Sequence, residues 1–342
     1  MPFPAESVSV IVVNFNGGEK VTRCVEALLA TAPGADVVVI DNASTDGSAE
    51  GLERSAGRVR LVRNRENAGY AAALNQGAKS SARDVLVFLN MDVEPEREWL
   101  EPLMTFLAEH EHVGAINPLI VLADGERINA AGQRIHVTGL GFNRSLGAPV
   151  VTAGIEPFEV TGIQGAAFAM RREVYEHIGG FDESGFLYHE DVNLSWLLRL
   201  AGYRLYCVPR SRVRHDYVLS MYAEKFHLLE RNRLAMLLAY LRWRTFVMLA
   251  PMLALTELFG WIYAVIRGHG LPGAKARAYG WVVRRRATIA QRRRVGRTLR
   301  RIGDAELLRA LHWRYEWGQF ASLAQERGEA RRKPVATLPL DR

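Results

Sequence analysis

The feature that most constrains the fold of this chain is a series of short apolar runs that end abruptly in polar residues. The clearest run covers residues 85–89 (VLVFL) and is followed by Asn90, Met91 and Asp92. An unbroken apolar run of this length is typical of a strand buried on both faces of a parallel sheet. Because side chains alternate along an extended chain, Asn90 and Asp92 should point to the same side.

An amide and a carboxylate at the carboxyl end of a central strand lie where open α/β sheets bind ligands. A phosphate held together with a hard cation would fit there. A strand that simply ends in an Asx turn explains the tripeptide alone equally well.

The same pattern recurs through the first third of the chain. Apolar runs at 8–13, 37–40, 59–62, 85–89 and 113–116 alternate with segments of helical periodicity, among them 67–79 and 96–110. This alternation predicts βαβ units, and therefore an α/β fold with a mostly parallel central sheet flanked by helices. Since parallel strands share a direction, the polar residues after the first, second and fourth runs should meet at one edge of the sheet.

Two common nucleotide-binding motifs are missing from the loop after the first strand. That loop reads NFNGGEK at 14–20, which contains neither G-x-G-x-x-G nor G-x-x-x-x-G-K-[ST]. It also lacks the Gly-rich, Arg-containing loop of sugar nucleotidyltransferases, which disfavours that class.

The periodicity disappears over residues 119–160, where we expect an irregular or β-rich insertion that forms a lid on the acceptor side. Order returns at 160–170, where several small residues would let a ligand or another backbone approach closely. The segment 186–202 then places Glu190 and Asp191 in the first turn of a predicted helix, where acidic side chains complement the helix dipole. Two extended pieces follow, at 204–208 and ending at His215.

Composition limits the compartment and the number of domains. The chain has 342 residues, of which 49% are hydrophobic, enough for one large domain with an extension or for two domains. Its only two cysteines, Cys24 and Cys207, form neither a disulfide framework nor a zinc motif and favour a reducing compartment. The first ten residues do not resemble a secretory signal.

The net charge of +7 is unevenly distributed along the chain. Residues 267–342 carry a formal charge of +13, whereas residues 1–266 carry −6. The basic character therefore belongs to the C-terminal segment, which indicates an anionic lipid surface rather than nucleic acid as its partner.

An apolar segment precedes this basic region. Residues 245–266 are long enough to span a bilayer, but they include Pro251, Glu257 and Gly260 and have arginines on both sides. An interfacial or re-entrant helix pair is our first interpretation, a buried helix or a contact between copies of the chain the second, and a true span the third. Arginine triplets at 284–286 and 292–294 suit anionic headgroups.

Six motifs together resemble glycosyltransferase family 2. They are VVNFNG at 12–17, VIDNASTDGS at 39–48, NAGYAAALNQG at 67–77, FLNMDV at 88–93, GGFDE at 179–183 and FLYHEDVNLSWLLRLAG at 186–202. The resemblance covers about residues 7–235 and is strongest to the rhamnosyltransferase and galactofuranosyltransferase-like branch. It implies a GT-A fold and inverting transfer of a sugar from a nucleotide sugar.

The resemblance also implies roles for individual residues. The donor nucleotide sugar would contact Asn14, Asn16, Asp41, Asn67, Gly69, Asn75, Asn90 and Asp92. Asp92 takes the second position of the family's D-x-D motif and would hold Mg²⁺ or Mn²⁺, with His215 as a further ligand. Because Asn90 replaces the first aspartate, we expect weaker cation binding. In the Glu190-Asp191 pair, Asp191 would be the general base and Glu190 would orient the acceptor or the base.

These observations predict two parts. Residues 1–222 would form the catalytic GT-A domain, and residues 223–342 a helical, basic, membrane-associated extension. The expected donor is dTDP-rhamnose or a UDP-sugar, and the expected acceptor is a lipid-linked glycan or polysaccharide of the cell envelope. The enzyme would lie on the cytoplasmic face of a bacterial inner membrane. The alternative is a non-catalytic nucleotide-sugar-binding or assembly subunit of the same fold.

Overall fold

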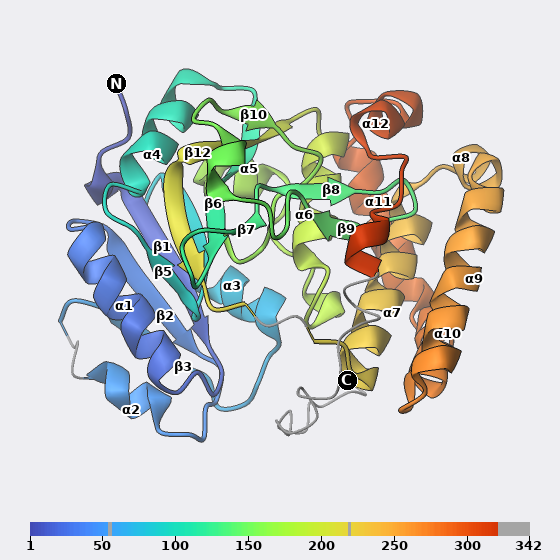
Figure 1. The fold of residues 1–342 in the computed structure, drawn as a ribbon, viewed down its shortest axis with the longest axis horizontal. Coiled ribbons are helices and arrows are strands. Elements are labelled where there is room, and N and C mark those ends of the chain that lie inside the picture. Colours follow the sequence, from blue (N-terminus) through green and yellow to red (C-terminus); the bar gives the residue numbers. More distant parts are fainter. Residues whose placement is uncertain (54–56, 218–219, 321–342) are drawn as a thin grey trace.

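The computed structural model describes residues 1–53, 57–217 and 220–320, and strands alternate with helices through the first half of the chain (Figure 1). In chain order the elements of this half are β1 (Val8–Asn14), α1 (Glu19–Thr31), β2 (Asp36–Asp41), α2 (Ser48–Glu53), β3 (Arg60–Arg63), α3 (Tyr70–Lys79), β4 (Val85–Asn90), β5 (Val93–Pro95), α4 (Leu100–Glu109), β6 (Val113–Leu122), β7 (Ile128–Ala130), β8 (Gln133–Ile135), β9 (Gly141–Asn143), β10 (Phe158–Glu159) and β11 (Ala167–Arg171). The second half continues with α5 (Arg172–His177), α6 (Glu190–Leu200), β12 (Arg204–His215), α7 (Ala223–Tyr240), α8 (Trp243–Met248), α9 (Ala250–Arg267), α10 (Leu271–Arg284), α11 (Arg286–Leu299) and α12 (Asp304–Ala310).

The central sheet has the strand order β10-β12-β6-β11-β4-β1-β2-β3, with β5 and β7 added to β12 and β6. Strands β1, β2, β3 and β4 are parallel, as the sequence predicted, and β12 is parallel to β6. Strand β11 runs antiparallel to both β4 and β6. The carboxyl ends of β4 and β12 and the amino end of β11 therefore lie at one edge of the sheet.

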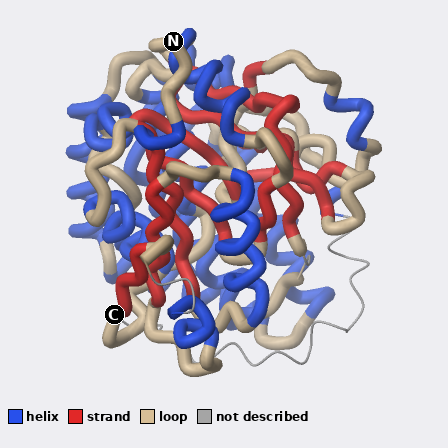
Figure 2. The backbone as a smooth tube through the Cα atoms, turned by 90° about the vertical axis from the view of Figure 1, so that its left-hand side faces the viewer, coloured by secondary structure: helices blue, strands red, loops and turns tan. Residues whose placement is uncertain are grey.

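Helices cover both faces of this sheet (Figure 2). On β4, Val85, Val87 and Leu89 pack into a core with α1 and α4, while Leu86 and Phe88 pack into a second core with α3, α5 and α6. All five side chains are fully buried. The unbroken apolar run thus has the physical cause that the sequence suggested, because each face of the strand contacts a layer of helices.

Some predicted boundaries were wrong. Residues 204–215 form one strand, β12, with an irregular register between Val208 and Arg212, rather than two extended pieces. The segment 93–95 pairs with β12, so that α4 begins only at Leu100. Within the insertion at 119–160, β7 and β10 add to the central sheet and β8 pairs with β9, so this region is β-rich.

The C-terminal helices α7 to α11 pack beside the sheet domain (Figure 1). We propose a boundary between residues 222 and 223, because α7 begins at Ala223. The two parts are nevertheless joined at the ligand-binding edge. The Asn232 side chain of α7 donates hydrogen bonds to the carbonyl oxygens of Gly185, Leu187 and Tyr188, over distances of 3.0, 3.1 and 2.8 Å.

A buried ion network joins α7, α9 and α10. Arg233 of α7 pairs with Glu230 at 3.0 Å and with Glu257 of α9 at 2.5 Å, and Lys275 of α10 pairs with the same two carboxylates. Burial opposes ionisation of Glu230, but the charges of Arg233 and Lys275 lower its pKa to about 2. Glu257, the one acidic residue of the apolar segment, therefore points inward.

Glu230→Ala should destabilise the fold by about 3–5 kcal/mol, because it leaves Arg233 and Lys275 buried with one carboxylate fewer. Urea unfolding monitored by circular dichroism measures this loss. Glu53→Ala is the matched control, since Glu53 is exposed and its pairing with Arg63 should contribute no more than about 1 kcal/mol. Equal midpoints for the two variants would contradict the prediction.

Helix α9 is the one helix in the described ranges that is long and apolar enough to cross a membrane. Its 18-residue window has a mean hydropathy of 1.2, and only 17% of that window is buried. Helix α9 is therefore not a helix buried within this chain, whereas the other half of the second interpretation, a contact between copies of the chain, stays a prediction. The exposed side of α9 is apolar and includes Leu258, Ile262, Val265 and Ile266.

Candidate active site

A cavity of about 630 Å³ opens at the edge where β4 and β12 end. Its wall contains Asn90, Met91 and Asp92 after β4, His215 and Asp216 at the end of β12, and residues 164–166 before β11. The loop 186–189 and the first turn of α6 form the opposite wall. The sheet topology thus gathers residues that are more than a hundred positions apart in the sequence.

Asp92 and His215 face each other in this cavity. The Asp92 Oδ1 and His215 Nε2 atoms are 3.3 Å apart, and the Asp92 side chain is 26% exposed whereas that of His215 is 6% exposed. His215 Nδ1 lies 2.9 Å from Oδ1 of the buried Asn129, which lies in β7. If Nδ1–H donates to Asn129, Nε2 carries no proton, and its lone pair faces the Asp92 carboxylate and can bind a cation.

This pair fits a divalent cation as two protein ligands. The described residues contain no group of three or more His, Cys, Asp or Glu side chains arranged for a metal ion. A cation held by Asp92 and His215 would thus need oxygen atoms from the ligand to complete its shell. Mg²⁺ and Mn²⁺ bind in this way at phosphate sites, with few carboxylates and several substrate oxygens.

Asn90 is fixed by a tyrosine of the neighbouring helix. Tyr70 donates its hydroxyl proton to Asn90 Oδ1 over 2.5 Å. Tyr70 is in turn positioned at the start of α3, where its backbone N–H donates to the Phe186 carbonyl over 2.7 Å. This contact requires Gly69, which has φ +90°, since a Cβ atom there would lie 2.8 Å from the Phe186 carbonyl oxygen.

Glu190 and Asp191 begin α6 inside the cavity. Asp191 Oδ2 accepts hydrogen bonds from Gln133 Nε2 at 2.8 Å and from the Gly165 backbone N–H at 3.0 Å. Gly165 has no side chain, and a Cβ atom would lie 3.2 Å from this carboxylate. The loop that leads into α6 is strained, because Tyr188 and His189 have φ angles of 65° and 72°.

Both residues are partly buried in the cavity wall, and burial is the main cause of their raised pKa values. The pKa of Glu190 rises to about 8, through burial first and the charge of Asp191 second. Burial also raises the pKa of Asp191, while hydrogen bonds from Val192, Gly165 and Gln133 oppose this rise. The second oxygen of Glu190, Oε2, is buried without a hydrogen-bond partner among the described residues. Burial therefore favours the protonated form of Glu190.

Glu190→Gln should stabilise the protein increasingly as the pH rises from 4.5 to 8. The folded pKa of Glu190 lies above the unfolded value of 4.5, so the parent loses stability as its unfolded state ionises through this range. Glutamine imitates the protonated acid and removes this loss, which is on the order of a few kcal/mol at pH 8. Thermal unfolding at pH 4.5, 6 and 8 measures the difference. The exposed Glu101 provides the control Glu101→Gln, and an equal, pH-independent effect of both substitutions would contradict the assignment.

Several predicted donor-binding residues are not among those that line the cavity. Asn14 is fully buried, and its Nδ2 donates to Asp41 Oδ1 at 2.8 Å and to Ser48 Oγ at 2.9 Å. Asn16 accepts from the Thr45 backbone N–H at 2.8 Å. These bonds tie together the loops after β1 and β2. They leave the predicted donor contacts of Asn14, Asn16 and Asp41 without a place in the cavity wall.

Asn75 also lies away from the cavity. Its amide donates to the Phe181 carbonyl at 2.9 Å and to Glu183 at 2.8 Å, and Tyr175 donates to its Oδ1 at 2.5 Å. Asn75 thus fastens α3 to the GGFDE segment. Asn67 does line the cavity, where its Oδ1 accepts from Asn42 at 2.8 Å.

Sequence reasoning missed several residues that shape the site, and five of them matter most for its geometry. They are Asn42, Tyr70, Asn129, Gln133 and Lys225. Asn42 and Tyr70 lie inside motifs that were recognised, next to the residues that were chosen. Asn129 and Gln133 belong to the irregular insertion, and no local pattern links them to His215 or Asp191.

Comparison with known proteins identifies the family. The profile of Glycosyl transferase family 2 matches residues 9–179, half of the chain. The matched range contains Asn90 and Asp92 and ends before Asp191 and His215. The chain is 30% identical over 229 residues to the N-acetylglucosaminyl-diphospho-decaprenol L-rhamnosyltransferase of Mycobacterium tuberculosis, a match that covers 60% of this chain and 75% of that protein.

Other relatives are longer than this chain. The pre-mycofactocin glycosyltransferase of M. tuberculosis is 33% identical over 220 residues, with 61% of this chain and 43% of that protein covered. The O-antigen biosynthesis protein RfbC of Myxococcus xanthus is 30% identical over 232 residues, with 64% and 18% covered.

Solved structures show the same fold. GalNAc-T7, crystallised with UDP, GalNAc and Mn²⁺, superposes with a TM-score of 0.58 at 20% identity, covering 77% of this chain and 58% of that one. The mannosyltransferase PcManGT of Pyrobaculum calidifontis, in complex with GDP-Man and Mn²⁺, gives a TM-score of 0.52 at 18% identity, covering 94% and 88%. The chain belongs to glycosyltransferase family 2 and has the GT-A fold, as the motifs predicted.

Proposed function

We propose that this family 2 glycosyltransferase is an inverting enzyme that transfers a sugar from a nucleoside diphosphate sugar to a lipid-linked or polysaccharide acceptor of the cell envelope. One observation carries the proposal: the Asp92–His215 pair and the partly buried Asp191 carboxylate line a single cavity. The Asp92–His215 pair suits a diphosphate leaving group, and Asp191 suits activation of the attacking hydroxyl. A direct displacement needs both.

On the donor side, Asp92 and His215 would bind Mg²⁺ or Mn²⁺. The cation would neutralise charge that develops on the departing diphosphate. Asn90, held by Tyr70, offers its amide N–H₂ to phosphate or ribose oxygens. Lys20, which also lines the cavity, adds a positive charge and is paired with Asp216 at 2.6 Å.

On the acceptor side, Asp191 would remove the proton of the attacking hydroxyl. Its Oδ2 is fixed by Gln133 and Gly165, so the carboxylate keeps one orientation in the cavity. A single base on the side opposite the leaving group produces inversion at the anomeric carbon. Glu190, whose protonated form is favoured by burial, could donate a hydrogen bond that orients the acceptor.

An apolar groove supports a lipid-linked acceptor. This groove of about 480 Å³ lies between α7, α9 and the β8–β9 region, and its lining includes Phe142, Phe226, Phe259, Tyr263 and Trp317. It shares six lining residues with the catalytic cavity, so the two are continuous; they are Gly141, Asn143, His189, Tyr217, Lys225 and Leu229. An isoprenoid chain suits the apolar end, and its diphosphate would meet Lys225 near the cavity. The rhamnosyltransferase relative acts on a decaprenol-linked sugar by name.

The same geometry supports a location on the cytoplasmic face of a bacterial inner membrane. A lipid-linked acceptor is presented at a membrane surface, and the exposed apolar side of α9 borders the groove. The free cysteines Cys24 and Cys207 are both buried, which agrees with a reducing compartment.

The test is a transfer assay with defined donors. The purified chain would be incubated with dTDP-rhamnose or common UDP-sugars, Mg²⁺ or Mn²⁺, and N-acetylglucosamine linked through a diphosphate to a short polyprenol. We expect nucleoside diphosphate release, a longer lipid-linked glycan, and an inverted anomeric centre by NMR. A retained anomeric configuration would overturn the mechanism. Donor binding without release under all conditions would favour the non-catalytic subunit instead.

A further inference from the structure

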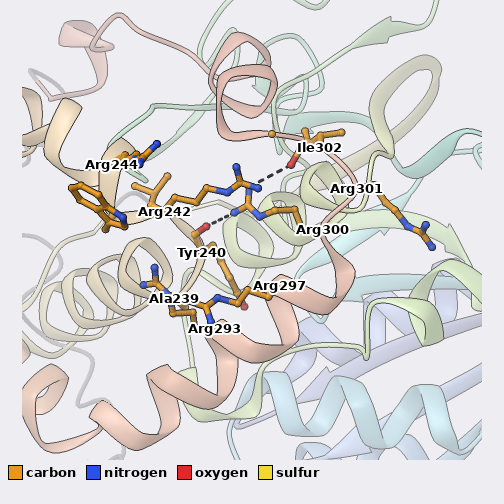
Figure 3. A pocket seen from close by; sticks show the side chains of 13 residues that line it. Ala239, Tyr240, Arg242, Arg244, Arg293, Arg297, Arg300, Arg301 and Ile302 are labelled. Carbon is orange, nitrogen blue, oxygen red and sulfur yellow. Dashed lines mark hydrogen bonds between the residues drawn. The ribbon is translucent and has the colours of Figure 1, made fainter.

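A second cavity, which shares no lining residue with the first, lies among the C-terminal helices (Figure 3). Its volume is about 640 Å³, and it is lined by three separate segments: 239–244 between α7 and α8, one side of α11, and 300–303 before α12. These segments contribute six arginines, namely Arg242, Arg244, Arg293, Arg297, Arg300 and Arg301. Among the described residues, none of those that line this cavity is acidic.

Most of this positive charge is not neutralised by the protein. Within the described ranges, Arg300 is the only one of the six arginines that is paired with a carboxylate, that of Asp304. Arg293 donates to the Leu238 carbonyl at 2.8 Å, and Arg244 lies over the Trp243 ring. The cavity therefore has an excess of guanidinium groups that can bind an anion.

Arg300 organises the centre of the cavity. Its guanidinium donates to the Tyr240 carbonyl at 2.5 Å and to the Ile302 carbonyl at 3.4 Å, between the arginines of the other two segments (Figure 3). Burial lowers the pKa of Arg300, Asp304 raises it, and the charges of Arg242 and Arg293 lower it further. An anion bound there would relieve this repulsion.

The cavity adjoins the apolar surface of α8 and α9. Trp243 lines the cavity and is 67% exposed, and Val247 and Met248 are exposed in the next turn. From residue 245 to residue 266 the exposed side chains of these helices are all apolar. A tryptophan between a basic pocket and an apolar helix face is typical of a protein that lies at the membrane interface.

We propose that this six-arginine cavity binds the phosphate headgroup of an anionic phospholipid while α8 and α9 insert their exposed side chains among the acyl chains. Guanidinium groups bind phosphate oxygens through paired hydrogen bonds, and the cavity is large enough for a complete headgroup. The inference deepens the proposed membrane location and does not depend on the catalytic assignments. It attributes lipid binding to specific contacts inside the cavity rather than to general charge attraction by the arginine triplets at 284–286 and 292–294.

The test compares two double variants with equal loss of charge. Arg242→Gln with Arg297→Gln removes two unpaired guanidinium groups from the cavity but leaves Arg300 and Asp304 in place. Arg286→Gln with Arg294→Gln removes two exposed arginines of α11 that lie outside it. Both would be measured by flotation with phosphatidylcholine vesicles that contain about one fifth phosphatidylglycerol, and thermal unfolding would verify folding.

We expect the cavity variant to bind these vesicles at least tenfold more weakly than the control variant. The double variant Arg242→Lys with Arg297→Lys keeps the charge but loses paired hydrogen bonds, and it should also bind more weakly than the parent. Equal losses in the cavity and control variants would overturn the pocket, because diffuse attraction of about 1 kcal/mol per arginine acts on both alike. Parent binding that is no stronger than to pure phosphatidylcholine would overturn it as well.

A separate arm distinguishes a lipid headgroup from soluble phosphate. Inorganic phosphate at millimolar concentration would be added to the parent and to the cavity variant, and the shift in Tm recorded. Phosphate-dependent stabilisation of the parent alone, combined with unchanged flotation of the cavity variant, would assign the cavity to a soluble anion and reject the lipid. Since none of these measurements requires a donor or acceptor sugar, they remain informative even if the proposed transfer reaction fails.

Discussion

Asp191→Asn is expected to reduce sugar transfer by about 10²–10⁴-fold while the Kd for the donor changes little. The asparagine amide has nearly the same shape as the carboxylate but cannot accept the proton of the acceptor hydroxyl. Its oxygen can still accept one of the hydrogen bonds that Gln133 and Gly165 donate to Asp191. Steady-state transfer rates, together with calorimetric donor binding, separate the loss of chemistry from the loss of binding.

The pH dependence of transfer activity provides a second measurement, because it would not change if Asp191 had only a structural role. Burial raises the pKa of Asp191, so parent activity should fall towards acidic pH as this carboxylate is protonated. The residual activity of the variant should lack this acidic limb. Asp124→Asn, in an exposed turn, is the control and should behave as the parent. Near-normal turnover of Asp191→Asn would remove the residue from the mechanism.

Asp92→Ala should be nearly inactive, with a loss on the order of 10³-fold, because cation binding supplies several kcal/mol of transition-state stabilisation. Asn90 and Asp92 both line the cavity at the end of β4, but only Asp92 carries a negative charge that can bind the cation. Apparent cation affinity, from titration of activity with Mn²⁺, should weaken in His215→Ala as well. Asn90→Asp should strengthen it by adding a second negative charge.

The control for this set is Glu94→Ala, two residues beyond Asp92. Glu94 is partly exposed and pairs with Arg23 at 3.0 Å rather than facing the cavity. Its removal should leave the Mn²⁺ titration unchanged. If Asp92→Ala keeps the cation dependence of the parent, the proposed cation site is wrong.

Much of the fold could be predicted from the sequence because its signals are local. Burial of β4 on both faces requires an unbroken apolar run, and the alternation of strands and helices requires parallel strands with crossover helices. Elements whose boundaries depend on pairing partners were predicted less well. Strand β5 is extended because it pairs with β12, and β12 is one long strand because it pairs with β6 along most of its length, which no local pattern reveals.

The residues of the candidate site also divide into those that local motifs located and those that they did not. Glu190, Asp191, Asn90 and Asp92 were found because each lies at the end of a strand or the start of a helix with a recognisable motif. Asn14 and Asp41 lie in equally recognisable motifs, yet they hydrogen-bond to each other and are not among the residues that line the cavity, so their donor contacts stay a prediction. A motif shows that a residue belongs to the edge of the sheet, but not on which side of a loop its side chain lies.

The sequence by itself determined the order of strands and helices, the polar edge after β4 and the basic, apolar character of the C-terminal segment, because these follow from periodicity and composition. Only the tertiary structure decided that β12 runs parallel to β4 and brings His215 to Asp92, and that Gln133 reaches Asp191. It also decided that arginines from three segments converge on one cavity beside α8. The physical reason is that these contacts join residues far apart in the chain, and their geometry is set by sheet order and helix packing rather than by neighbouring residues.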